Sequence, residues 1–90
     1  MTNAEARALH KGMFVASPHS TPAYRIRKLA EDPWVSEDLS IVRLLIVGNA
    51  GAWVPPDDYM AAPGPETAFT WSISKHMFVS RYAEREHHHA

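Results

Sequence analysis

The middle of the chain carries the clearest pattern of hydrophobic positions. Its apolar residues recur at the three- and four-residue spacing of one helix face, namely at Leu39, Val42, Leu45 and Ile46. Ser36 precedes them as a candidate N-cap, and Gly48 stands where a helix usually ends. Glu37 and Asp38 fall in the first turn, where acidic residues are favourable. The pattern therefore predicts a buried central helix over residues 36–48.

The same stretch also fits a buried strand. Four of its residues are β-branched, and such side chains favour strands: Ile41, Val42, Ile46 and Val47. In this alternative, residues 41–47 pair with residues 52–54 through a turn at residues 48–51. The capping signals favour the helix and the β-branched residues favour the strand. The helix is the primary prediction, and the strand stays open as its alternative.

Two further helices are predicted before the central one. Residues 3–14 are rich in alanine, which favours helix, and Asn3 is a candidate cap. The second helix opens at Thr21-Pro22, a cap followed by proline at the first helical position, and ends before Pro33. Trp34 and Val35 then form a short hydrophobic link to the central helix.

The last element, residues 66–86, combines two patterns. Its first part alternates Phe69, Trp71 and Ile73 with polar residues, which is typical of a strand. From Lys75 onward the composition favours a helix. Either one long helix follows the proline-rich loop at residues 55–65, or a short strand precedes a shorter helix.

Together these elements predict a mainly α fold of three to four helices, with room for a short strand or hairpin. An α+β fold is the alternative. Ninety residues, of which 46% are hydrophobic, suit a single domain. We expect this domain over residues 1–86, followed by a mobile histidine-rich tail at residues 87–90.

Composition narrows the classes of function. A formal net charge of −1 gives no strong field to attract nucleic acid or an anionic membrane. The absence of cysteine excludes disulfides and thiolate metal sites. The uncharged stretch at residues 44–56 is shorter than the ~20 apolar residues of a membrane span. We therefore expect a cytoplasmic protein without a membrane contact.

The polar residues do not form a known catalytic or metal-binding motif. His87, His88 and His89 are consecutive, and consecutive side chains on a helix diverge by about 100°, so they do not converge on one ion. Asp57 and Asp58 are adjacent and lack the alternating spacing of a calcium loop. A solvated tail and a turn cap are the expected roles, so no catalytic residue, metal site or cofactor is predicted.

A nucleic-acid-binding regulator is the alternative function. The densest basic cluster consists of Arg25, Arg27 and Lys28, on the predicted second helix. Two helices joined by a short link also suggest a helix-turn-helix, whose second helix enters the major groove. In this chain the groove-binding helix of the motif would be the predicted central helix. It would begin with Glu37 and Asp38, whose negative charges repel DNA phosphates.

The primary functional prediction is a small non-enzymatic protein-interaction module, such as a subunit, adaptor, inhibitor or homodimer. Aromatic residues are enriched at interface hot spots. A continuous C-terminal helix would carry more apolar surface than one core face needs, and the excess implies a protein contact. The partner would be another protein or a second copy, bound through four aromatic residues: Trp53, Trp71, Phe78 and Tyr82.

Overall fold

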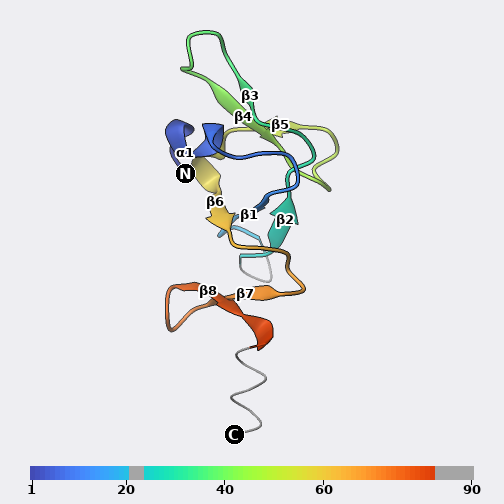
Figure 1. The fold of residues 1–90 in the computed structure, drawn as a ribbon, viewed down its shortest axis with the longest axis vertical. Coiled ribbons are helices and arrows are strands. Elements are labelled where there is room, and N and C mark those ends of the chain that lie inside the picture. The colour runs from blue at the N-terminus through green and yellow to red at the C-terminus, as the bar shows by residue number, and fades with distance from the viewer. Residues whose placement is uncertain (21–23, 83–90) are drawn as a thin grey trace, which may run out of the picture.

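The fold of the protein, obtained as a computed structural model, is mostly β (Figure 1). The structure describes residues 1–20 and 24–82. Within them lie eight short strands in antiparallel sheets and one short α-helix, so the predicted mainly α fold is wrong. The elements follow in the order α1 (Asn3–Arg7), β1 (Phe14–Ala16), β2 (Ile26–Lys28), β3 (Trp34–Val35), β4 (Val42–Leu45), β5 (Trp53–Val54), the 3₁₀-helix η1 (Pro56–Asp58), β6 (Met60–Ala62), β7 (Phe69–Ser72) and β8 (Met77–Ser80).

Two three-stranded sheets build the main body. One has the strand order β2-β1-β6 and the other has the order β3-β4-β5. The chain just after β2 connects them, because Leu29 forms an antiparallel bridge with Ile46, directly after β4. The amide of Ala30 donates to the carbonyl of Leu45 at 2.8 Å, which continues this pairing. The two sheets therefore share one hydrogen-bonded connection, and the chain passes through it from β2 into β3.

The hydrophobic core lies between these sheets and α1. Its buried members come from α1 and the segment after it, β1, the bridge residues and β4: Ala6, Leu9, Val15, Leu29, Val42, Leu44 and Ile46. Along β4, Val42 and Leu44 are buried and Arg43 and Leu45 are only half-buried. This alternation has the period of two that a strand imposes. One face of β4 therefore belongs to the core and the other faces outward.

The predicted central helix is replaced by a turn and a strand. Residues 36–41 form the connection between β3 and β4, in which the amide of Ser36 donates to the carbonyl of Ile41 at 3.0 Å. Leu39, placed in the core by the helical pattern, is 53% exposed. The strand alternative is the one that the structure forms, since β4 pairs with β5 across the turn at residues 48–51. Burial of alternate residues of β4 outweighs the capping signals.

The first predicted helix is much shorter than expected. Helix α1 covers Asn3–Arg7, and Thr2 rather than Asn3 is its N-cap. A capping box forms because the Thr2 hydroxyl accepts from the amide of Glu5 while the Glu5 carboxylate accepts from the amide of Thr2. The Asn3 amide instead donates to the carbonyl of Ser40 at 3.0 Å, which ties α1 to the β3–β4 connection.

The other two predicted helices are also corrected. Where the second helix was expected, Ile26–Lys28 is strand β2, and the predicted cap at Thr21-Pro22 falls outside the described residues. At the C-terminal end, β7 and β8 form an antiparallel hairpin with Trp71 opposite Phe78. The helix expected from Lys75 is therefore absent over residues 75–80. The domain limit at residue 86 and the tail at residues 87–90 fall outside the described residues.

Figure 1 shows how these parts are arranged in space. The sheets of the main body lie toward one end of the molecule, and the β7–β8 hairpin lies toward the other. Across residues 1–20 and 24–82, no helix has the length and apolarity needed to cross a membrane.

Candidate functional site

The outward face of the β3-β4-β5 sheet is the candidate site. Register places Trp34 of β3 directly opposite Arg43 of β4, and Trp53 of β5 directly opposite Leu45. Arg43 and Leu45 are two residues apart and therefore point to the same side of the sheet. Because directly paired residues also share a face, all four side chains lie on the side away from the core.

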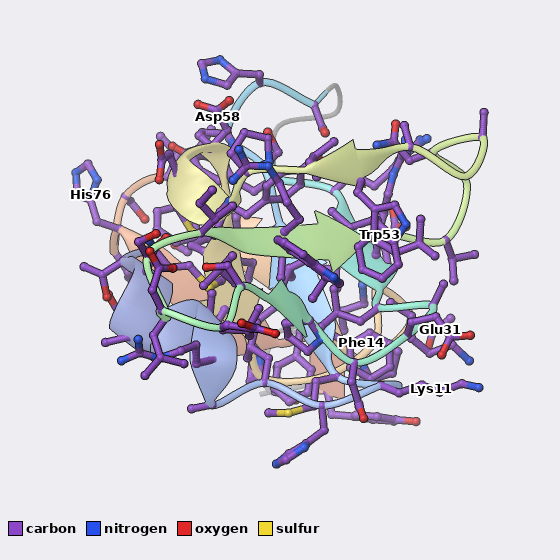
Figure 2. The ribbon with its side chains drawn as sticks, turned by 90° about the horizontal axis from the view of Figure 1, so that it is seen from above. Lys11, Phe14, Glu31, Trp53, Asp58 and His76 are labelled. Carbon is purple, nitrogen blue, oxygen red and sulfur yellow. The ribbon has the colours of Figure 1, made fainter. Side chains whose placement is uncertain are left out.

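This face carries a shallow hollow of about 300 Å³. Its walls are the side chains of Trp34, Arg43 and Trp53. The two tryptophans remain 51% and 43% exposed, respectively. Figure 2 shows Trp53 beside the central strand β4. Two large aromatic side chains that flank one hollow, each with half of its surface in water, form a concentrated apolar patch.

The core explains why both tryptophans point outward. The neighbouring residues Val35 and Val54 pack against the core from the same two strands. Neighbouring side chains of a strand point to opposite faces. Because Val35 and Val54 point into the core, Trp34 and Trp53 point to solvent. The hollow is therefore held by strands that are anchored in the core, rather than by a loose loop.

Among the residues that the structure describes, Arg43 is the one charged side chain in the wall of the hollow. Its Nη1 donates to the carbonyl of Val42 at 2.8 Å. Among the described residues, no carboxylate lies within ion-pair distance of its guanidinium. A guanidinium carries five N–H donors, so Arg43 keeps donors and a full positive charge for a group that enters the hollow.

The four residues predicted to bind a partner are not gathered on one surface. Trp53 lies at the hollow, whereas Trp71 and Phe78 belong to the β7–β8 hairpin. The Trp71 ring stacks on Tyr24 with 4.2 Å between centroids and meets Phe78 edge-on at 5.0 Å. These two residues are thus engaged in internal packing. Tyr82 is 66% exposed and follows β8.

The residues of the predicted basic cluster, Arg25, Arg27 and Lys28, do not form one surface. Arg25 lies 3.7 Å from the carboxylate of Glu66. Arg27 is half-buried and Lys28 is exposed. As neighbours on β2, these two side chains point to opposite faces of the strand. The cluster does not lie on a helix, so the helix-turn-helix arrangement is lost together with the helices that it requires.

Asp38, Asp57 and Asp58 lie in turns and short connections of the fold. Asp57 and Asp58 lie in η1. Asp38 accepts hydrogen bonds from the hydroxyls of Ser36 and Ser40, each at 2.7 Å, and these contacts lower its pKa to about 2. In the part of the chain that the structure describes, no group of three or more potential ligands is placed to hold a metal ion. The tail histidines fall outside that part.

The sequence interpretation missed two of the three described residues that line the hollow. The sequence pattern places Trp34 in a link between helices and Arg43 in the central helix. Their common face becomes visible only when residues 42–45 are treated as a strand, because Arg43 and Leu45 then alternate with the buried Val42 and Leu44. The strand alternative for residues 41–47 therefore already placed Arg43 and Leu45 on one face.

Known proteins do not assign this surface a function. The chain matches no protein-family model, no curated protein and no solved structure. The function of the hollow is therefore inferred from its own residues.

Proposed function

We propose that the protein is a small binding module that recognises another protein through the hollow between Trp34 and Trp53. The observation that carries this proposal is the pairing of two half-exposed tryptophans with an arginine on one sheet face. Tryptophan and arginine are the residue types most enriched among interface hot spots. They lie here on strands anchored in the core, so little conformational freedom is lost on binding.

This proposal moves the predicted interaction surface. Trp53 is retained, and Trp34 and Arg43 join it. Trp71 and Phe78 support the hairpin through their mutual contact. Tyr82 is an exposed aromatic residue next to the hairpin and therefore represents the competing surface.

Selection from a random peptide library displayed on phage tests the proposal without assuming a partner. Peptides enriched on the wild-type protein are measured against Trp34→Ala and Trp53→Ala. We expect each variant to weaken binding by roughly 30-fold or more, which corresponds to the about 2 kcal/mol of an interface hot spot. Both side chains lie on an exposed face, so the variants should keep the wild-type circular dichroism spectrum.

Tyr82→Ala and Met77→Ala are the matched controls, since both remove an exposed apolar side chain from the hairpin region. They should bind the selected peptides as the wild type does. If instead the controls lose binding and the tryptophan variants keep it, the hairpin is the binding surface and the proposal is wrong. Failure to select any peptide that depends on Trp34 and Trp53 would also reject it.

A further inference from the structure

We infer that the hollow takes an extended, proline-rich segment that carries an acidic residue between its prolines. This inference rests on the proposed function and specifies the chemistry of the partner. It is drawn from the spacing of the two tryptophans and from the charge of Arg43 between them.

The spacing of the tryptophans suits a polyproline II helix. Trp34 and Trp53 are separated by two strand spacings across the sheet and two residues along it, which places their backbones about 12 Å apart. Prolines on one side of a polyproline II helix repeat every three residues, or about 9 Å. The two lengths differ by about 3 Å, which is within the reach of two tryptophan side chains that line the same hollow.

The chemistry of the walls suits such a segment as well. Proline-rich segments dock in aromatic-lined grooves because they are already extended and lose little entropy on binding. The hollow offers two aromatic walls for two prolines. The backbone carbonyls of a polyproline II helix have no internal partners and can accept hydrogen bonds from Arg43.

The charge of Arg43 selects an acidic residue between the prolines. Its guanidinium lies opposite Trp34 in the register and has no carboxylate partner within the described residues. Arginine pairs with a carboxylate through two parallel hydrogen bonds, a geometry that adds specificity. An aspartate or glutamate in the bound segment therefore supplies the missing partner.

Other occupants fit less well. A methylated lysine prefers an aromatic cage without a cation, and Arg43 repels it. Single-stranded nucleic acid stacks on aromatic rings, but its phosphates need a basic groove. Of the described residues, one cation lines this hollow, and the net charge of the chain is −1. The chain's own Pro56 is buried and therefore cannot enter the hollow.

The test uses two fluorescein-labelled peptides and measures fluorescence anisotropy with the full-length protein. One peptide repeats the unit Pro-Glu-Ala and the other repeats Pro-Lys-Ala, so they differ at one position of the repeat, where the charge changes sign. We expect saturable binding of the glutamate peptide and at least tenfold weaker binding of the lysine peptide, because one charged hydrogen-bonded pair is replaced by a repulsion. A labelled oligothymidylate serves as the nucleic-acid probe and should not bind.

Arg43→Glu is the decisive variant, since it should reverse the preference and bind the lysine peptide more tightly. If Arg43→Glu does not fold, Arg43→Gln should bind the glutamate peptide and the lysine peptide with affinities within about threefold of each other. An unchanged preference in the folded variant overturns the inference. Binding of the oligothymidylate that requires both tryptophans also overturns it.

The peptide result separates this inference from the proposed function. If neither designed peptide binds, but peptides of another composition selected by display require Trp34 and Trp53, the inference is wrong and the proposed function stands. If no peptide of any kind requires the two tryptophans, both are rejected.

Discussion

Leu39 adopts a left-handed backbone conformation, with φ at +64°, in the connection between β3 and β4. This conformation costs a leucine about 1–2 kcal/mol, whereas the short polar side chain of asparagine offsets part of this cost by hydrogen-bonding the local backbone. Because the side chain is largely exposed, Leu39→Asn should raise the free energy of unfolding by about 0.5–1 kcal/mol. Urea denaturation followed by tryptophan fluorescence measures the change.

Leu39→Ala is the control for this prediction. It removes the same apolar side chain but has no polar group to hydrogen-bond the neighbouring backbone, which is what lets asparagine tolerate this conformation, so it should give no gain. Both variants keep the Leu39 carbonyl, which accepts from the Arg7 guanidinium at 3.3 Å. A gain of equal size in both variants would show that loss of exposed apolar surface, rather than backbone strain, causes it.

Asp38 makes the stability of the same connection depend on pH. The hydroxyls of Ser36 and Ser40 and the Ser40 amide donate to its carboxylate and lower its pKa from 3.8 to about 2 in the folded protein. A carboxyl with a lowered folded-state pKa stabilises the fold above its unfolded pKa, and this contribution is lost as the pH falls. We therefore expect the contribution in full above about pH 5 and its loss between about pH 4 and pH 2.

Asp38→Asn should remove this acid-dependent step and lower the melting temperature at neutral pH. Melting followed by circular dichroism between pH 2 and pH 7 measures both effects. Glu37→Gln changes the neighbouring residue of the same connection and should keep the wild-type pH profile. A step of the same height in Asp38→Asn would assign the acid dependence to other carboxylates.

Residue-level signals in the sequence were valid, but they were assigned to the wrong element. Ser36 and Asp38 do form side-chain hydrogen bonds with nearby backbone amides, as capping residues do. They stabilise a connection between strands instead of a helix start. Serine and aspartate make similar local hydrogen bonds in both settings, so the residue types alone do not distinguish them.

At the scale of the element, the central segment satisfies two periods at once. Leu45 and Ile46 extend the helical pattern, whereas Val42, Leu44 and Ile46 alternate as a strand requires. Pairing decides between them, because β4 is bonded to β3 and β5 and Ile46 forms a bridge with Leu29. Pairing with Leu29 joins segments that are distant in sequence and cannot be read from the local pattern. The sequence therefore offered the strand only as an alternative to the helix. The alternation at residues 69–72 was more distinct and matches β7.

The β7–β8 hairpin depends on its aromatic contacts. A two-stranded hairpin by itself is at best marginally stable in water, and no described residue of β7 or β8 belongs to the main core cluster. Phe78→Ala removes the edge-on contact with Trp71. We expect amide hydrogen exchange in β7 and β8 to accelerate at least tenfold, while exchange in β4 changes by less than about threefold.

Val79→Ala is the matched control within β8, because Val79 pairs with Thr70 outside the aromatic stack. It should accelerate hairpin exchange much less than Phe78→Ala does. Equal acceleration in β4 and the hairpin upon the Phe78 change would show that the molecule opens as one cooperative unit.

At the scale of the whole molecule, the candidate site is assembled from three separate segments. Trp34, Arg43 and Trp53 come from β3, β4 and β5, and only the sheet register brings them together. The sequence could suggest Trp53 as an interaction residue, because aromatic residues are enriched at interface hot spots. It could not place Trp34 and Arg43 beside Trp53, because this requires the pairing of β4 with both neighbours.

The whole arrangement predicts that the two faces of β4 respond differently to the same substitution. Leu44 is fully buried in the core, whereas Leu45 is half-buried on the face that carries the hollow. Leu44→Ala should lower the free energy of unfolding by about 2–5 kcal/mol, as expected when a core leucine leaves a cavity. Leu45→Ala removes the same atoms one position away and should lower it by less than about 1.5 kcal/mol. Urea denaturation of both variants measures the difference, and equal losses would mean that the face with the two tryptophans is buried like the core and cannot receive a ligand.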